Sequence, residues 1–189
     1  EATRIQLIKD NFGDSNTYVG EHLADEPGMS RYNDLARFVN LYKSALPDKE
    51  VYINLFPQYA NAATQLQGEY EDYIDQYLKK IKTKSLSYDF YGLVKNSDLI
   101  SGMYYSNLDM VRSKTLEKRM PFWVITQGCE CPSARYPNEE EQRWSVWSKI
   151  AVGSKGISYF CYWTPSGTTW ESLIDLEGNR TQMYDWVKK

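Results

Sequence analysis

Five strand-like runs recur along this chain at a nearly constant interval. By subtraction, their starts lie 33, 35, 35 and 36 residues apart, near Tyr18, Val51, Leu86, Pro121 and Ile157. A strand, a helix and two loops need about this length, whereas hairpin-connected strands return after far fewer residues. The repeat therefore predicts an α/β fold of about five parallel strands alternating with helices. In such folds the functional side chains stand at the carboxyl ends of the strands.

The composition is that of a globular protein with one core. The 189 residues are 42% hydrophobic and 25% charged, and we expect a single domain over residues 1–189. The net charge is -3 and no block of Lys and Arg stands out, which argues against a nucleic-acid partner. No apolar run approaches the ~18 residues of a membrane span, so we expect no membrane partner.

The aromatic content is high, with 16 Tyr, 6 Trp and 6 Phe. Two interpretations stay open: a large aromatic core with amphipathic helices, or a ring-stacking surface for a ligand such as a carbohydrate. Three cysteines, Cys129, Cys131 and Cys161, give no paired disulfide framework, and a single histidine is a poor basis for zinc. We therefore predict neither a metal nor another cofactor.

Local patterns place the elements along the chain. The chain opens at Glu1 inside a helical pattern, as a processed product or a piece of a longer protein would. Ser30 is a candidate N-cap for the second helix, and Asn138 for a later helix that opens with three glutamates. The spacing predicts helices over 2–12, 30–46, 70–81, 97–117, 138–153 and 181–189, and strands over 18–24, 51–56, 86–91, 122–126 and 157–162.

An acidic pair followed by proline, Asp25-Glu26-Pro27, ends the first strand-like run. If the strand stays extended, Glu26 shares one face with Gly20, His22 and Ala24, and Asp25 takes the other face. This alternation points Glu26 into a pocket at the rim, above His22. The alternative is that both acids are turn or capping residues before Pro27.

The stretch 20–27 resembles the end of the fourth strand in clan A glycoside hydrolases. Those (β/α)8 barrels carry Asn-Glu-Pro there, and the glutamate is the general acid/base. The stretches 52–57, 87–91, 121–124 and 151–163 are similar to strands five to eight of β-galactosidase-like barrels. The resemblance covers nearly the whole chain. It implies the C-terminal portion of a barrel, from the third helix to the eighth βα unit.

A complete barrel usually needs about 250 residues, and a parallel sheet without its first three strands would leave open edges. The resemblance therefore implies a further partner, the remainder of the barrel, on the same or another chain. It also implies that Glu26 is the catalytic acid. The family's nucleophile is a glutamate at the end of strand seven, where Thr126 stands in this sequence. Asp89, Glu130 or Asp25 would have to supply the second carboxyl.

If Glu130 is not the second carboxyl, we expect it to be a solvated loop residue. If Asp89 is not the second carboxyl, we expect it to bind sugar hydroxyls. The resemblance further implies that Trp163 forms the floor under a sugar ring, unless it is a core residue. The expected substrate-binding residues are His22, Asp25, Asn54, Tyr91, Gln127 and Trp163. His22 is alternatively a hydrogen-bonded interior histidine.

The function implied is hydrolysis of glycosidic bonds in an oligo- or polysaccharide by carboxylate acid/base catalysis, without a cofactor. Two alternatives stay open: a non-catalytic carbohydrate-binding barrel, or a structural fragment completed by another chain. Barrels that act on polysaccharides are often exported, so we expect a secreted or cell-surface protein.

Overall fold

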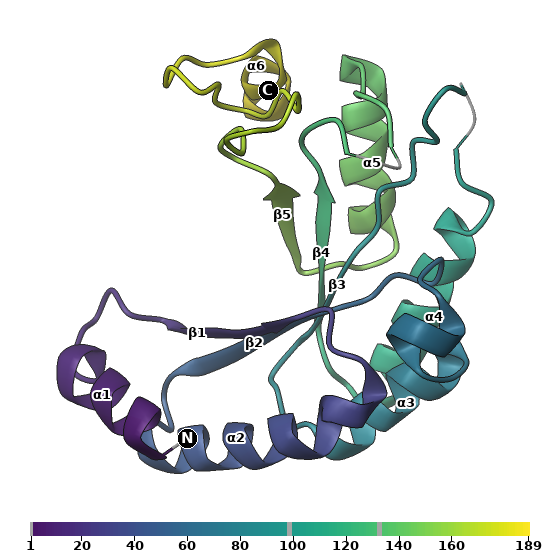
Figure 1. The fold of residues 1–189 in the computed structure, drawn as a ribbon. Helices are drawn as coiled ribbons and strands as arrows, with labels where there is room; N and C mark the ends of the chain where they lie inside the picture. Colours follow the sequence, from purple (N-terminus) through teal and green to yellow (C-terminus); the bar gives the residue numbers. More distant parts are fainter. Residues whose placement is uncertain (1, 98–99, 132–133) are drawn as a thin grey trace. The chain divides into compact units, whose positions relative to one another are not determined.

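The computed structural model describes residues 2–97, 100–131 and 134–189. Strands and helices alternate along the chain (Figure 1). The strands are β1 (Gly20–Asp25), β2 (Glu50–Leu55), β3 (Leu86–Asp89), β4 (Phe122–Gln127) and β5 (Gly156–Phe160). The α-helices are α1 (Ala2–Phe12), α2 (Tyr32–Ala45), α3 (Tyr70–Lys80), α4 (Tyr104–Glu117), α5 (Glu139–Ala151) and α6 (Gln182–Lys188), with a 3-10 turn, η1 (Met29–Arg31), and a π-helical turn, η2 (Ala62–Leu66).

The strands form one sheet in the order β1-β2-β3-β4-β5, and both terminal pairs are parallel. Sequence neighbours are therefore also sheet neighbours, joined by helical crossovers. This confirms the predicted fold class, an α/β partial (β/α)8 barrel with five parallel strands. Among the described residues, no helix has the length and apolar content needed to cross a membrane.

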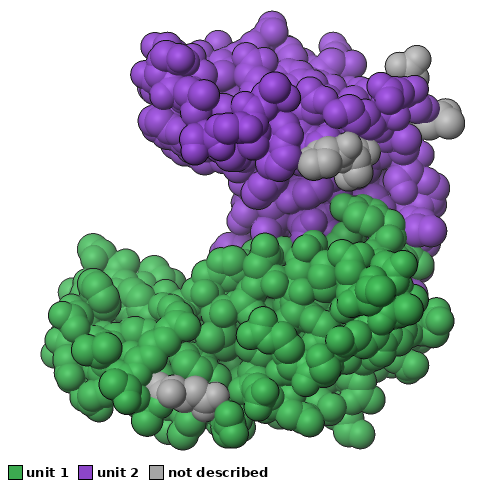
Figure 2. Space-filling view, viewed as in Figure 1, with its two compact units in different colours: residues 1–87, 113–121 green, residues 88–112, 122–189 purple. Residues whose placement is uncertain are grey.

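The chain divides into two compact units, coloured separately in Figure 2. One comprises residues 1–87 and 113–121, and the other comprises residues 88–112 and 122–189. We call these unit 1 and unit 2 and describe each by itself. That residues 1–189 form one domain stays a prediction.

The core of unit 1 is built from tyrosine rings and strand residues. The ring of Tyr32 on α2 lies 5.5 Å from Tyr73 and 5.9 Å from Tyr77, both on α3. All three rings are fully buried, and so are Ile53 and Leu55 of β2. Much of the aromatic content of this unit is therefore core, as the first of the two interpretations predicted.

In unit 2, alternate residues of β4 face opposite sides of the sheet. Phe122, Val124 and Thr126 are buried, whereas Trp123 is 40% exposed. Helix α5 begins with a capping box, in which the side chain of Asn138 accepts a hydrogen bond from the Glu141 amide at 2.9 Å. The predicted Asn138 cap is thereby confirmed.

Two predicted helix starts are wrong. Ser30 is not the cap of α2, because the η1 turn precedes that helix and Arg31 occupies the cap position. The helix predicted from residue 97 begins at Tyr104 instead, and residues 98–99 lie outside the described part of the chain. Ser101 donates its amide hydrogen to the carbonyl of Gly92 at 2.7 Å, so Ser101 hydrogen-bonds to the segment after β3 instead of entering a helical turn.

The fifth strand is shorter than predicted. It ends at Phe160, whose carbonyl accepts a hydrogen bond from the Gly128 amide at 2.6 Å. Two residues later, the carbonyl of Tyr162 accepts a hydrogen bond from the amide of Ile174 at 2.8 Å. The chain therefore leaves the sheet because its backbone pairs with a later loop segment.

Candidate functional site

The acidic pair stands at the carboxyl end of β1, and a β-bulge decides which acid shares a face with His22. The register pairs His22 with Tyr52 and then, after a shift, Ala24 with Ile53 and Asp25 with Asn54. The extra residue is Leu23, which inverts the alternation for the rest of the strand. The expectation that Ala24 and Glu26 share the face of His22 is therefore wrong. Asp25 takes that place.

On this face of unit 1 a row of polar groups crosses three strands. Asn54 Nδ2 donates to Asp25 Oδ1 at 3.1 Å, and Ser87 Oγ donates to Asn54 Oδ1 at 3.1 Å. The hydroxyl of Tyr52 also bonds to Ser87 Oγ, and the ring of His22 lies edge-on to Tyr52 at 5.3 Å. Asn54 is buried, whereas Asp25 is exposed. The buried side-chain amide of Asn54 therefore holds one oxygen of the exposed Asp25 carboxylate.

The backbone at Glu26 leaves the strand. Glu26 has a φ of 47°, in the left-handed region that few non-glycine residues adopt. Its amide donates to the carbonyl of Asn54 at 2.8 Å, so β2 still fixes this position. The hydroxyl of buried Tyr73 donates to the Pro27 carbonyl at 3.0 Å and accepts from the Phe56 amide at 3.2 Å. One tyrosine thus ties together the ends of β1 and β2, and Glu26 lies half-buried between these anchors.

Unit 2 carries the other predicted residues at the ends of β3, β4 and β5. Asp89 is 5% exposed at the end of β3. Glu130 lies in the loop after β4, where Lys95 Nζ forms an ion pair with it at 2.8 Å. Lys95 is exposed and Glu130 is half-buried, so this ion pair lies at the surface. Of the two candidate carboxyls, Asp89 is the one with the more buried setting.

Gln127 shapes the loop that follows β4. Its side-chain Nε2 donates to the carbonyl of Cys129 at 2.9 Å and to that of Arg135 at 2.5 Å. Gln142 of α5 in turn donates to the Gln127 backbone carbonyl at 3.0 Å. Both amide hydrogens of Gln127 are therefore used within the protein, whereas its buried Oε1 has no hydrogen-bond partner among the described residues.

Aromatic rings gather at the end of β5. Tyr91 stacks on Phe160 with ring centroids 5.8 Å apart, and Trp170 meets Phe160 edge-on at 6.3 Å. Phe160 is 36% exposed and pairs with Gln127 in the register of β4 and β5. Trp163 lies three residues beyond the strand and is 52% exposed, so it is a surface residue and not a core one. Sequence reasoning selected Tyr91 and Trp163 but missed Phe160 and Trp170.

Thr126, which the sequence resemblance placed at a nucleophile position, faces α5. Its hydroxyl bonds to Ser145 Oγ at 2.7 Å and accepts from Lys149 Nζ at 2.8 Å. Lys149 also donates to the Ser145 carbonyl at 3.2 Å and hydroxyl at 2.7 Å, and it is completely buried. Burial lowers the pKa of Lys149 to about 7. This polar cluster was missed, although Gln142, Ser145 and Lys149 recur at helical spacing on one face of α5.

The three cysteines form a cluster of free thiols behind the aromatic rings. Cys129 Sγ lies 3.6 Å from Cys131 Sγ and 4.0 Å from Cys161 Sγ. The hydrogen bond with Cys131 and burial raise the pKa of Cys129, and burial raises the pKa of Cys161 to about 11. These two thiols are therefore protonated at neutral pH and act in packing. Within the described ranges, no group of three or more His, Cys, Asp or Glu side chains could hold a metal ion.

Comparison of the sequence with protein-family models finds no matching family, and comparison with curated proteins finds no match. Solved structures do match. The β-galactosidase of the Antarctic haloarchaeon Halorubrum lacusprofundi has a TM-score of 0.57 at 17% identity, over 83% of this chain and 24% of that chain. The β-galactosidase of the psychrophilic Marinomonas ef1 has a TM-score of 0.56 at 13% identity, over 82% and 25%.

A GH128 endo-β-1,3-glucanase from Sorangium cellulosum has a TM-score of 0.58 at 10% identity, over 98% of this chain and 74% of that chain. At these identities the similarity establishes the fold and not the reaction. The chain thus has a glycoside hydrolase-like partial barrel. It spans about a quarter of the length of the two β-galactosidases.

Proposed function

We propose that this chain is the portion of a clan A-type, β-galactosidase-like barrel from the third helix to the eighth βα unit, and that it takes part in hydrolysis of glycosidic bonds in an oligo- or polysaccharide. The observation that carries this proposal is the acidic pair at the carboxyl end of β1, with Asp25 held by the buried amide of Asn54 at 3.1 Å. In parallel α/β folds this end of the strands is where ligands bind.

In this proposal Glu26 protonates the oxygen of the departing group. A general acid must be held within reach of that oxygen, and a fixed backbone favours this. The Glu26 amide is bonded to Asn54, and the next carbonyl, of Pro27, is bonded to Tyr73. These contacts support a Glu26 backbone that is already in place before substrate binds.

The second carboxyl, acting as base or nucleophile, would be Asp89, with Glu130 as the next candidate. Asp89 lies at a strand end in a buried setting, which suits a group that must be fixed in orientation. Glu130 is held by Lys95, and using it would require loss or rearrangement of that ion pair. Retaining and inverting hydrolysis both need two carboxyls, so replacing either one must reduce turnover.

Substrate hydroxyls would be bound by His22, Asp25 and Asn54, with Tyr91 and Trp163 supplying aromatic surface. Gln127 would act indirectly, through the hydrogen bonds that it donates to the carbonyls of Cys129 and Arg135. Exposed aromatic rings such as Trp163 suit the apolar faces of sugars because they bury area at little entropic cost. The partners proposed are the carbohydrate and the remainder of the barrel, on the same or another chain. The proposed location is outside the cell or on its surface.

A second candidate function is a non-catalytic carbohydrate-binding barrel. The observation that favours it is Thr126, which stands where the family has its nucleophile and bonds to α5 instead. Such a protein would keep the aromatic surface and lose turnover.

The experiment compares hydrolysis of a panel of aryl glycosides by the protein and by its Glu26→Gln, Asp89→Asn and Glu130→Gln variants. We expect Glu26→Gln and Asp89→Asn each to lower kcat by about 10²–10⁴-fold, with Glu130→Gln closer to the parent protein. Equal rates for the parent and Glu26→Gln would remove Glu26 from the reaction. Binding of sugars without turnover of any glycoside would favour the second candidate.

A further inference from the structure

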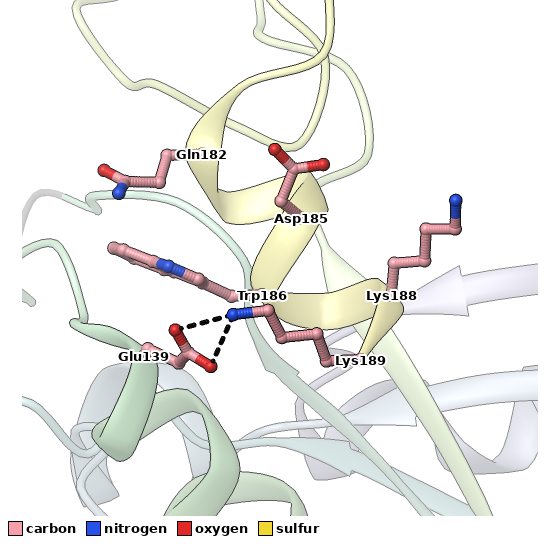
Figure 3. A pocket seen from close by; sticks show the side chains of 6 residues that line it. All are labelled: Glu139, Gln182, Asp185, Trp186, Lys188 and Lys189. Carbon is pink, nitrogen blue, oxygen red and sulfur yellow. Dashed lines mark hydrogen bonds and ion pairs between the residues drawn. The ribbon is translucent and has the colours of Figure 1, made fainter.

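Two neighbouring hollows in unit 2 share the side chains of Trp186 and Lys189. The first has a volume of about 620 Å³. It is lined by Glu139, Gln182, Asp185, Trp186, Lys188 and Lys189 (Figure 3). The second has a volume of about 150 Å³ and is lined by Gln142, Arg143, Val146, Trp147, Tyr159, Trp186, Val187 and Lys189. Trp186 therefore borders both hollows, and none of these residues belongs to the set proposed for catalysis.

The indole of Trp186 is held in place before any ligand arrives. Its ring centroid lies 6.3 Å from that of Tyr136, at an interplanar angle of 56°. Trp186 is half-buried, and in Figure 3 its indole lies between the side chains of Gln182 and Glu139. A flat ring fixed beside amide and carboxylate groups is the arrangement that binds the apolar face of a sugar while its hydroxyls find polar partners.

The charges around the first hollow balance. The carboxylates of Glu139 and Asp185 stand with the ammonium groups of Lys188 and Lys189. Lys189 Nζ bonds to both carboxylate oxygens of Glu139, at 3.0 and 3.1 Å, and Arg143 bonds to one of them at 3.1 Å. The lining itself carries two carboxylates and two ammonium groups, so the hollow offers donors and acceptors of both signs. This favours a neutral polyhydroxylated ligand over a phosphate, a metal ion or a charged peptide.

The second hollow adds further aromatic surface beside Trp186. Trp147 is 63% exposed there, and Tyr159 and Val187 add further apolar lining. Large exposed aromatic side chains with polar neighbours are typical of binding sites. The first hollow alone has the volume of an ordinary small-molecule site, about 300–1,000 Å³. A ligand that uses both hollows would reach Trp147 as well as Trp186.

We propose that Trp186 and Trp147 form a surface site that binds a neutral oligosaccharide, separate from the residues proposed for hydrolysis. The inference rests on the proposed function only in taking carbohydrate as the ligand class. The site would hold a polysaccharide chain on unit 2 whether or not the chain is cleaved there.

The test is native electrophoresis through gels that contain a β-linked galactan, a β-linked glucan, xyloglucan or galactomannan. The proteins run are the parent, Trp186→Ala, Asp185→Ala, Trp147→Ala and Tyr105→Ala. Tyr105 is the matched control, because it is an exposed aromatic of unit 2 outside both lining sets. Asp185 is exposed, so its replacement tests the first hollow at little risk to folding. Glu26→Gln is run in parallel to separate this site from turnover.

We expect at least one of these polysaccharides to retard the parent, Tyr105→Ala and Glu26→Gln alike. Trp186→Ala should weaken the apparent dissociation constant at least about tenfold, with smaller losses for Trp147→Ala and Asp185→Ala. Retardation of Trp186→Ala and Asp185→Ala equal to the parent, or no retardation of the parent in any gel, would overturn the site. Binding that depends on Trp186 without turnover would keep this site and refute the proposed hydrolysis, whereas turnover without such binding would do the reverse.

Discussion

Asn54 Nδ2 donates a hydrogen bond to Asp25 Oδ1 across 3.1 Å, from the end of β2 to the end of β1. The same amide accepts from Ser87 Oγ at 3.1 Å, so a buried side chain orients the exposed carboxylate of the acidic pair. The pairing exists because the bulge at Leu23 puts Asp25 opposite Asn54 in the register. It defines the first prediction.

Replacing Asn54 by alanine removes both hydrogen bonds and leaves Ser87 Oγ without this acceptor. We expect a loss of about 1–3 kcal/mol in the free energy of unfolding and a fall of about 10–100-fold in kcat/KM for a glycoside substrate. Urea unfolding and steady-state kinetics measure the two effects. Asn40→Ala, on the exposed side of α2, is the control and should change neither. Unchanged kinetics for Asn54→Ala would refute the role given to the pair.

The second prediction concerns Tyr73, whose hydroxyl links the Pro27 carbonyl and the Phe56 amide. Tyr73→Phe keeps the ring in the core and leaves two backbone groups without this partner. We expect unfolding to become easier by about 1–2 kcal/mol and kcat to fall, because the segment that carries Glu26 loses an anchor. Tyr162→Phe, at an exposed ring, serves as the matched control. Identical unfolding curves for Tyr73→Phe and the parent would count against the anchor.

The third prediction follows from the lowered pKa of Lys149, about 7 in the folded protein against 10.5 in the unfolded chain. Between these values the unfolded state binds more protons, so the stability due to this group rises from pH 7 to pH 10, by up to about 4 kcal/mol. Lys149→Met removes this rise and stabilises the protein at pH 7, because Thr126 and Ser145 stay bonded to each other. Chemical unfolding at several pH values measures it.

The control for that series is Lys79→Met, an exposed lysine of α3. Its pH dependence should parallel that of the parent. If Lys149→Met and Lys79→Met give the same curve, Lys149 is charged in the folded state and the account of its burial is wrong.

The fourth prediction concerns Glu141 at the start of α5. Arg135 donates to it at 2.8 and 2.5 Å, and the Asn138 amide donates at 2.9 Å. These contacts, led by the Arg135 bond, lower the pKa of Glu141. A lowered carboxyl pKa gives stability that is present above the unfolded value of 4.5 and lost as the pH falls through the folded value.

Glu141→Gln should therefore cost about 1–2 kcal/mol at pH 7 and progressively less below pH 4.5. Thermal unfolding at pH 7 and pH 3 measures the difference. Glu140→Gln, an exposed neighbour in the same turn, is the control. A cost for Glu141→Gln that does not change with pH would contradict the ionic part of this explanation.

Periodicity was sufficient to predict the fold class. Five runs at a constant interval and amphipathic stripes such as Tyr73, Ile74 and Tyr77 require helical crossovers, and the structure has them. Ends of elements were less predictable. The start of α4 depends on the hydrogen bond between Ser101 and Gly92. This bond is not a contact of helical spacing, so helical periodicity does not predict it. Ser30 matched a capping preference, but a 3-10 turn intervened.

The position of the candidate site at the strand ends was predictable, whereas the set of residues that share one face of the sheet was not. Parallel topology places Asp25, Asn54 and Asp89 at strand ends, and all three are there. The bulge at Leu23 has no clear sequence signal, and it changes which residues share the face of His22. Lys149 was missed because a charged residue is expected on the solvent side of a helix, whereas here Thr126 and Ser145 satisfy its hydrogen bonds inside.

The central claim is that Glu26 of the acidic pair is the general acid, and the dependence of the Glu26→Gln defect on the leaving group tests it most directly. A general acid matters for a poor leaving group and hardly for an activated phenol, which departs without a proton. The measurement is kcat/KM of the parent and of Glu26→Gln for aryl glycosides of graded phenol pKa. The account predicts a loss of about 10²–10⁴-fold for the glycosides of the least acidic phenols, shrinking toward none for dinitrophenyl glycosides. The same fractional loss for every leaving group, or no loss at all, would contradict it.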